Sequence, residues 1–419
     1  MTGRLLLALL WLLLAAPASA TVGWVQVVDA ATCKPVAGAI VTVAGKPETA
    51  DSEGFLALPQ PARTVAVRAA GYRRLELQDD GPLANARLAR LQPFRPKALY
   101  LSFYGIGNAE LRGAALKLLD ATELNALVVD VKGDRGLIPY RSAVPLAAEV
   151  GAQNVITVHD MPALLADLHR RGIYLIARVV AFKDDPLARA RPGWAIHDRE
   201  GNLYVDREGL SWTDPFRPEV RNYVLDVAEE AARLGFDEIQ FDYLRFPDEA
   251  GLVFAEPSTQ ASRVAAITGF LAEARKRLAP YNVFISADVF GYVLWNRDDT
   301  HIGQRLEDLA PLVDYLSPML YPTSFSFGIP GYANPVAAPR EIVGLSLANA
   351  GRRTGLSGLH FRPWLQAFRD YAFDRRVFGA EQIRAQIDAA EAFGSDGWML
   401  WNPRNVYGEG GLNKAAGAR

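Results

Sequence analysis

Hydrophobic positions recur along the chain in short runs, and the pattern of these runs changes near residue 98. Before that point, the stretches "GWVQVVDA", "GAIVTVAG", "GFLALP" and "RTVAVRAAGY" are apolar or alternating, and Gly, Pro or Asp separates them. This pattern is typical of strands joined by turns. It predicts a small all-β sandwich over residues 21–78. Gly and Pro interrupt any period over residues 79–97, which we interpret as a linker.

From residue 98 onward, apolar runs alternate with amphipathic helical patterns. The runs cover residues 98–103, 126–131, 173–180, 238–244, 283–290, 313–320, 362–368 and 397–401. Eight strands that alternate with helices predict an α/β fold, a (β/α)8 TIM barrel, over residues 98–405. A flexible C-terminal tail is expected over residues 406–419. The alternative is a doubly wound open sheet, but no GxGxxG turn follows the first run.

The first 20 residues have the pattern of a secretory signal peptide. Arg4 precedes the apolar run "LLLALLWLLLAA", and the small residues "ASA" offer a cleavage site after residue 20. The run is short for a membrane-spanning helix, which favours cleavage over an uncleaved anchor. We therefore expect an exported bacterial protein, periplasmic or secreted, with no stable membrane span after cleavage. Cys33 is the only cysteine, so no intrachain disulfide can form.

Composition narrows the class of partner. The 419 residues are 22% charged, with a formal net charge of -2. Nucleic-acid binding requires a basic surface, and the chain contains no block of Lys and Arg. We expect no nucleic-acid partner.

Polar residues concentrate at the carboxyl ends of the predicted strands, where TIM barrels carry their chemistry. Asp242 and Asp288 interrupt apolar strands and are followed by apolar or aromatic residues rather than by a turn. A buried carboxylate is costly unless it is paired or used, so this position favours a catalytic role for both. The other candidates at strand ends, expected to bind substrate, are Asp130, Lys132, Arg178, Gln240, Tyr321, Gln366, Trp401 and Asn402. For Asp130 a turn cap, and for Arg178 a structural counter-ion, are the alternatives.

Aromatic residues lie near the same strand ends. Trp212, Tyr243, Tyr292, Tyr321 and Trp401 could stack on the C–H faces of sugars, although core packing is the alternative for each ring. Arg245, in the loop after Asp242, would line the same cleft. Aromatic rings beside several carboxylates indicate a carbohydrate substrate.

Signals for other chemistries are weak. The five histidines show no HxxxH spacing, no GxSxG motif is present, and Cys33 lies outside the predicted barrel. We therefore predict no cofactor and no metal ligands. A Mg²⁺ or Ca²⁺ site built on Asp carboxylates stays open as an alternative.

Several motifs together resemble a known family. "VVDVKGDRG", "YLIARVVAFKDDPLA", "FDEIQFDYLRFP", "SADVFGY", "LSPMLYPTSF" and "DGWMLWNP" are similar to the putative glycosyl hydrolase domain family. The resemblance implies a barrel akin to the α-amylase-like glycosidases, in which Asp242 matches the nucleophile. Gln240 stands where those enzymes carry Arg, and Asp288 stands where they usually carry Glu. Residues 21–78 resemble the carboxypeptidase regulatory-like sandwich through Pro35, the "DSEG" turn and Gly71.

These observations lead to a two-carboxylate hypothesis for hydrolysis of a cell-envelope or extracellular polysaccharide. Asp242 would be nucleophile or base, held ionised by Arg178, and Asp288 would be the general acid. Asp130 would bind sugar hydroxyls or tune the pair. The alternatives are a glycan-binding protein without activity on a retained barrel, and a lyase or transglycosylase that uses the same acids.

Overall fold

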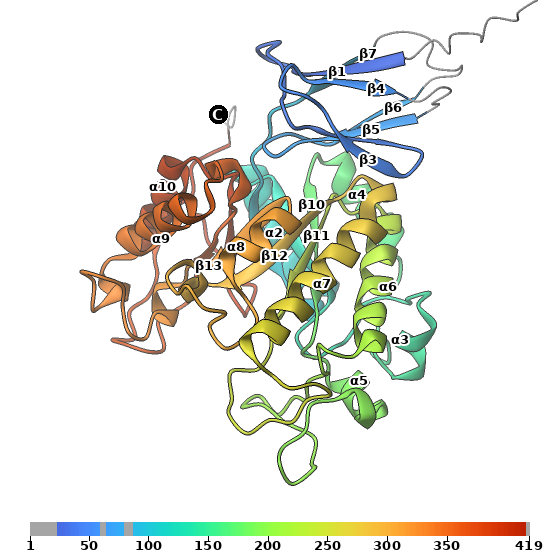
Figure 1. Cartoon of the computed structure of the whole chain (residues 1–419). Helices are drawn as coiled ribbons and strands as arrows, with labels where there is room; N and C mark the ends of the chain where they lie inside the picture. The colour runs from blue at the N-terminus through green and yellow to red at the C-terminus, as the bar shows by residue number, and fades with distance from the viewer. Residues whose placement is uncertain (1–22, 59–63, 79–86, 416–419) are drawn as a thin grey trace, which may run out of the picture.

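The computed structural model describes residues 23–58, 64–78 and 87–415. The N-terminal part contains two small sheets that pack as a sandwich (Figure 1). One has the order β4-β1-β7, with β1 Gly23–Asp29, β4 Phe55–Leu58 and β7 Arg87–Leu91. The other has the order β3-β2-β5-β6, with β2 Ile40–Val43, β3 Lys46–Thr49, β5 Thr64–Arg68 and β6 Leu75–Gln78. Valine, alanine and leucine side chains fill the space between them.

The C-terminal part is a closed barrel of eight parallel strands, which confirms the predicted fold class. Its strands are β8 Lys97–Leu101, β9 Ala126–Lys132, β10 Tyr174–Val180, β11 Glu238–Asp242, β12 Phe284–Phe290, β13 Tyr315–Met319, β14 Trp364–Gln366 and β15 Trp398–Trp401. Each strand pairs with the next in sequence, and β15 pairs with β8 to close the barrel. Every residue of β9 and β10 is buried, because one face meets the barrel interior and the other meets helices.

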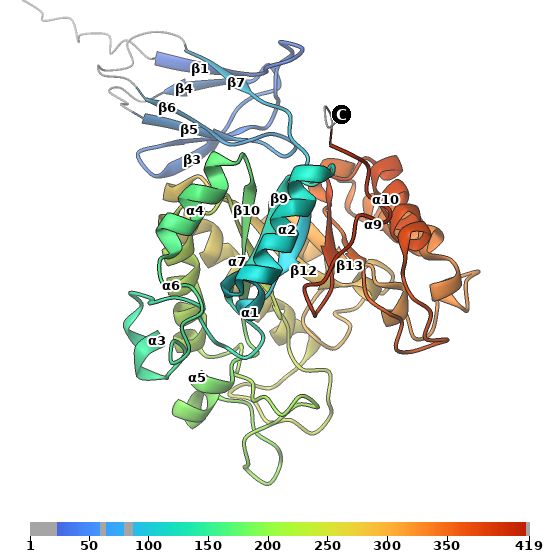
Figure 2. The same cartoon turned by 180° about the vertical axis from the view of Figure 1, so that it is seen from behind.

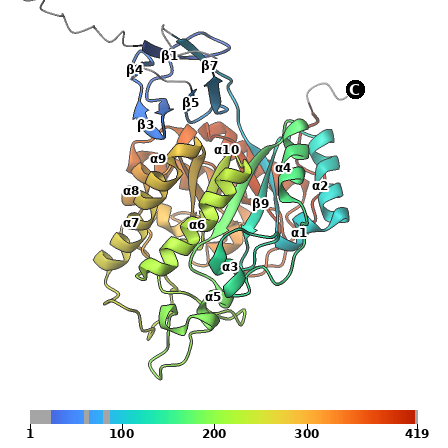
Figure 3. The ribbon, with the colours of Figure 1, turned by 90° about the vertical axis from the view of Figure 1, so that its right-hand side faces the viewer.

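Helices surround the strands (Figure 3). They are α1 Phe103–Gly107, α2 Ala109–Ala121, α3 Pro145–Glu149, α4 Met161–Arg170, α5 Asp185–Ala190, α6 Pro218–Leu234, α7 Gln260–Leu278, α8 Leu306–Leu309, α9 Pro339–Thr354 and α10 Ala380–Phe393. Short 3-10 helices span Pro192–Trp194, Ala279–Tyr281, Gly291–Leu294, Ala310–Leu312, Pro322–Ser324, Pro335–Ala337 and Gly358–His360. Helix α6 is capped by Gly235, whose φ of 107° is a left-handed conformation that glycine adopts without strain, so the chain turns directly into β11.

Two segment boundaries differ from the sequence prediction. Within the expected linker, residues 87–91 form β7, which pairs in parallel with β1, so this segment completes the sandwich. Alternation over five residues is too short a signal to stand out beside the neighbouring glycine and prolines. Residues 406–415 of the expected tail pack on the barrel, where the backbone N–H of Asn413 donates to Glu123 over 2.8 Å.

The sandwich covers the end of the barrel at which the strands begin (Figures 1 and 2). Arginines of the first 95 residues pair there with carboxylates that lie just before barrel strands. The ion pairs are Arg68–Asp314 at 3.7 Å, Arg74–Asp237 at 3.2 Å and Arg95–Asp396 at 3.3 Å. The opposite end, where the strands finish, is therefore the end left to the connecting loops.

Within the described residues, no helix is both long and apolar enough to cross a membrane. The predicted signal peptide, residues 1–20, lies outside the described residues.

Candidate active site

Polar side chains from neighbouring strands meet inside the barrel near the strands' carboxyl ends. Asp130 of β9 lies beside Arg178 of β10 in the strand register, and Asp242 is the last residue of β11. Because successive strands of the chain are neighbours in the barrel, Arg178 contacts Asp130 and Asp242, which lie 48 and 64 positions away in the sequence. All three side chains are buried.

Arg178 is the centre of this cluster. Its guanidinium donates to Asp130 at 2.7 Å, to Asp134 at 2.6 Å and to Asp242 at 2.8 and 2.6 Å. Burial alone would lower the pKa of Arg178, but the surrounding carboxylates raise it well above its usual value. The guanidinium therefore stays charged and holds the carboxylates in fixed orientations.

The backbone also fixes Asp242. The N–H of Tyr243 donates to its Oδ1 over 2.6 Å, and Tyr243 has a φ of 46°, in the left-handed region that a tyrosine rarely adopts. The Tyr243 ring packs edge to face on Trp212 with 5.5 Å between centroids, which holds this conformation. Backbone strain of this kind is concentrated at functional sites. Asp242 thus accepts hydrogen bonds from Arg178 at one carboxylate oxygen and from the strained backbone of Tyr243 at the other.

Asp130 has a different set of partners. Besides Arg178, its carboxylate accepts from the Tyr100 hydroxyl at 2.8 Å and the Phe103 N–H at 3.0 Å. Burial raises the pKa of Asp130, and the charge of Arg178 opposes that rise. This carboxylate stabilises the cluster and the start of α1, so the turn-cap and substrate-binding interpretations both keep a physical basis.

Asp288, on the strand beside Asp242, lies in an almost dry environment. One oxygen accepts from Trp364 Nε1 at 2.8 Å, while Oδ2 is buried with no hydrogen-bond partner among the described residues. Burial and then the charge of Asp242 raise the pKa of Asp288 well above its usual value. The two neighbouring carboxyl groups therefore have different surroundings: Asp242 is paired with a guanidinium, while burial disfavours the charged form of Asp288.

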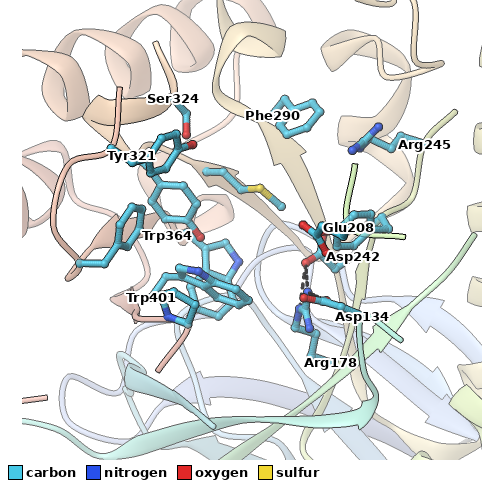
Figure 4. Close-up of a pocket in the computed structure, with 15 residues that line it drawn as sticks. Asp134, Arg178, Glu208, Asp242, Arg245, Phe290, Tyr321, Ser324, Trp364 and Trp401 are labelled. Atoms are coloured by element: carbon cyan, nitrogen blue, oxygen red, sulfur yellow. Dashed lines mark hydrogen bonds and ion pairs between the residues drawn. The ribbon is translucent and has the colours of Figure 1, made fainter. Parts of the chain in front are cut away.

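A cavity of about 370 Å³ opens above this cluster (Figure 4). The acids that line it are Asp134, Glu208 and Asp242, whereas Asp288 is 1% exposed and does not line it. The remaining lining residues are Arg178, Tyr243, Arg245, Phe290, Met319, Tyr321, Ser324, Trp364, Phe368, Tyr371, Trp401 and Pro403.

The cavity continues on two sides. A hollow of about 230 Å³ shares Asp134, Glu208 and Trp401 with it. A hollow of about 250 Å³ on another side shares Phe290 and Ser324. The three hollows adjoin one another through these shared lining residues, and we refer to them together as the cleft.

Aromatic rings form one wall of the cavity. Trp401 stacks on Tyr100 with 4.0 Å between centroids and meets Trp364 edge to face at 5.4 Å. In Figure 4, Trp401, Trp364 and Tyr321 lie on the side of the cavity opposite Arg245. The rings hold one another, so they present a preformed apolar surface next to the carboxylates.

Several predicted substrate-binding residues line this cavity and others do not. Arg178, Tyr243, Arg245, Tyr321 and Trp401 line it, in addition to Asp242. Asp130 lines the adjoining hollow near Trp401, and Tyr292 lines the one near Phe290.

Lys132 is not on the cavity wall. It is fully buried, pairs with Asp184 at 2.8 Å and donates to the Val180 carbonyl at 2.7 Å. The register between β9 and β10 shifts after Arg178, so alternation no longer predicts where the Lys132 side chain lies.

Gln240 and Trp212 are also structural in this arrangement. Gln240, two residues below Asp242, donates to Ser317 Oγ at 3.2 Å inside the barrel. The Trp212 indole donates to Asp206 at 3.0 Å, and its ring packs against the ring of Tyr243.

Gln366 and Asn402 bind backbone rather than facing the cavity. Gln366 accepts from the Thr323 N–H at 3.0 Å. Asn402 donates to the Ala367 and Val406 carbonyls, both at 2.8 Å. Both shape the loops that carry the cavity wall.

Sequence reasoning missed some of the wall. Asp134 follows β9 in the loop "KGD", a signal that was visible but was not assigned to the site. Glu208 comes from the long connection between α5 and α6, where the sequence has no clear period, and it pairs with Lys183 at 2.7 Å. Phe290 ends β12 and Ser324 follows β13, where the same barrel rule would have found them.

A second ionic layer lies deeper in the barrel. Glu238 accepts from Arg362 at 2.5 Å, from Ser286 at 2.6 Å and from Tyr174 at 3.0 Å, and Arg362 pairs with Asp396 at 2.9 Å. All of these groups are buried and none lines the cavity, so we interpret this layer as structural. The described residues contain no group of three or more His, Cys, Asp or Glu arranged to hold a metal ion.

Comparison with known proteins adds a family and a fold. Residues 98–407 match the model of a family described as putative glycosyl hydrolase domain. No curated protein matches the chain. Among solved structures, the glycoside hydrolase domain of PgaB (BpsB) from Bordetella bronchiseptica has a TM-score of 0.54 at 15% identity, covering 75% of this chain and 95% of that one. A hypothetical protein from Ruminiclostridium thermocellum is 36% identical, with a TM-score of 0.41, over 46% of this chain and 97% of that one.

Proposed function

The chain belongs to the family described as putative glycosyl hydrolase domain, and we propose that it hydrolyses O-glycosidic bonds with two carboxyl groups, Asp242 and Asp288. The observation that carries the proposal is their contrast: Asp242 is held by Arg178, while Asp288 is buried with one oxygen unpartnered. Glycosidases need one ionised carboxylate and one protonated carboxyl at the scissile bond.

Asp242 is the ionised member. It lines the cavity, and Arg178 and the Tyr243 N–H both donate hydrogen bonds to its carboxylate oxygens. In this role it attacks the anomeric carbon or activates the water that does so. Its fixed orientation reduces the reorganisation needed during the reaction.

Asp288 is the proton donor in this proposal. Its raised pKa supplies the proton, and its position next to Asp242 supports action on the same bond. Since Asp288 does not line the cavity, bound substrate must shift its rotamer or that of a neighbour. Glu208 is the rival donor because it lines the wall, where it pairs with Lys183 at 2.7 Å.

The cleft supports a polymeric substrate. Three adjoining hollows, of about 230, 370 and 250 Å³, offer room for several sugar units in a row. The signal-peptide pattern of residues 1–20 supports export, so we propose a cell-envelope or extracellular polysaccharide as the substrate class.

Substrates with different leaving groups test the assignment. Asp242→Asn should abolish turnover of aryl and alkyl glycosides alike. Asp288→Asn should lose about 10²–10⁴-fold on alkyl glycosides but retain most turnover of dinitrophenyl glycosides, whose leaving group needs no proton. If Glu208→Gln rather than Asp288→Asn shows this difference, Glu208 is the donor.

The control variant is Asp120→Asn, which removes an exposed carboxylate of α2 and should keep full activity. Product mass distinguishes hydrolysis from lyase or transfer chemistry, because only hydrolysis adds water. Oligosaccharide binding with no product after long incubation would instead favour the glycan-binding alternative.

A further inference from the structure

Arg245 occupies an unusual position in the cleft. It follows Asp242 by three residues, is partly buried, and lines the central cavity (Figure 4). Its guanidinium carbon lies 4.8 Å from the centroid of the Trp212 ring and 4.6 Å from that of Phe290. One hydrogen bond holds it, from Nη1 to the Phe246 carbonyl at 3.1 Å. The rings fix the guanidinium, and most of its donors remain available.

The two buried cations near the central cavity are neutralised by carboxylates, whereas Arg135, which lines the adjoining hollow near Trp401, is exposed to solvent. Arg178 has Asp130, Asp134 and Asp242, and Lys183 has Asp206 and Glu208. Arg245 makes no ion pair with any carboxylate in the described part of the chain. Asp248, in the same loop, is exposed and does not pair with it. Burial lowers the pKa of Arg245, which shows that its surroundings compensate the charge incompletely.

We propose that Arg245 forms a subsite for an acidic sugar, whose carboxylate completes the ion pair that the protein leaves open. The planar guanidinium, held between rings, presents paired N–H groups that match a carboxylate. The inference rests on the proposed function in that the ligand is a carbohydrate chain bound in the cleft.

The rest of the cavity restricts where this charge can lie. Asp134, Glu208 and Asp242 line other parts of the wall and would repel an anion placed against them. An acidic sugar at Arg245 would supply the missing counter-ion. Neutral sugars beside Asp134, Glu208 and Asp242 would avoid repulsion by these carboxylates. The preferred glycan therefore alternates acidic and neutral units rather than carrying a carboxylate on every sugar.

Glycan binding tests the subsite independently of turnover. Asp242→Asn protein, which should not consume its ligand, is applied to an oligosaccharide array. Each glycan that contains uronic acid is printed beside its carboxyl-reduced form, and sulfated and phosphorylated glycans form separate arms. We expect at least one alternating uronic-acid glycan to bind about tenfold or more tightly than its reduced form, the effect of one charged hydrogen-bonded contact. Adding Arg245→Gln should abolish this difference in affinity between the acidic glycan and its reduced form. The affinity for the reduced form itself should change by no more than about twofold.

Two further variants keep the test specific. Arg245→Lys retains the charge without the planar fork and should keep part of the difference, and Lys117→Gln removes an exposed cation of α2 and should keep all of it. Equal binding of reduced forms, no binding of any uronic-acid glycan, or stronger binding of sulfated or phosphorylated glycans would overturn the proposal. Glycans that bind through Arg245 but are not cleaved by the wild-type protein would instead overturn the proposed hydrolysis and leave the subsite standing.

Discussion

Replacement of Arg178 by methionine would remove the guanidinium that holds Asp130, Asp134 and Asp242 while keeping an apolar stem of similar length. The Asp130 and Asp242 side chains are 2% and 5% exposed, whereas that of Asp134 is 34% exposed. The substitution therefore leaves two carboxylates buried without their cation. We expect the folded state to lose more from this change than from any single exposed ion pair.

The magnitude follows from the distances. At the 2.6–2.7 Å separations of these pairs, each attraction amounts to about 6 kcal/mol at an effective dielectric constant of about 20. Desolvation of Arg178 and repulsion among the carboxylates offset much of this attraction. Removal of one partner from a buried pair typically costs about 3–5 kcal/mol, which is the loss expected for Arg178→Met near pH 8.

The loss should depend on pH in a defined direction. Without Arg178, Asp130 loses the charge that opposes the burial-driven rise of its pKa, so the folded variant binds more protons than the unfolded one. Stability of the variant then increases as pH falls. The difference in unfolding free energy between wild type and variant should narrow from pH 8 to pH 5.

Urea unfolding at pH 5, 6.5 and 8 measures this difference, with Arg189→Met as the matched control. Arg189 pairs with Asp185 on the exposed surface of α5, and its loss should cost about 0.5 kcal/mol or less at every pH. A loss below about 1 kcal/mol for Arg178→Met, or one that does not change with pH, would contradict the structural account of the cluster.

Further substitutions test other parts of the barrel. Because burial raises the pKa of Asp288, Asp288→Asn should stabilise the fold at pH 8 and change little at pH 4, measured by urea unfolding even as activity falls. Lys132→Met should cost about 3–5 kcal/mol by stranding Asp184, and Asp184→Asn in the same chain should restore most of it. If Lys132 bound substrate instead, the double variant would show a raised KM with normal stability. Gly397→Ala should destabilise by about 3 kcal/mol or more in thermal melts, since its Cβ would lie 1.7 Å from the Pro96 oxygen at a φ of 75°. An unchanged Tm would show that β15 can move away from that contact.

The fold could be predicted because its signal is repeated. Parallel barrel strands are apolar on both faces, so each appears as a continuous run, and the barrel requires eight of them. The same rule located Asp242, Asp288 and Arg178 on neighbouring strands. It missed β7, because a five-residue edge strand has too few positions to establish a period.

The site was harder to predict for two physical reasons. The alternation of residues along a strand predicts which face a side chain lies on, but not how deep in the barrel it lies. Gln240 and Asp242 share a face of β11, yet Gln240 packs in the interior and Asp242 reaches the cavity. The path of a loop cannot be predicted from this alternation either. Glu208 lies on the cavity wall because its long loop folds back over the barrel, and Lys132 leaves the wall because the strand register shifts beside it.

The docking of the sandwich on the barrel has a consequence for how the molecule unfolds. Arg95 pairs with Asp396, Asp396 with Arg362, and Arg362 with Glu238, so a continuous chain of charges runs from the segment after the sandwich to the barrel interior. Loss of the sandwich would leave the outer carboxylates without their arginines and loosen the buried layer behind them. The two domains should therefore unfold together, as one calorimetric transition rather than two, and a barrel cut free at residue 97 should melt at a lower temperature than the intact chain.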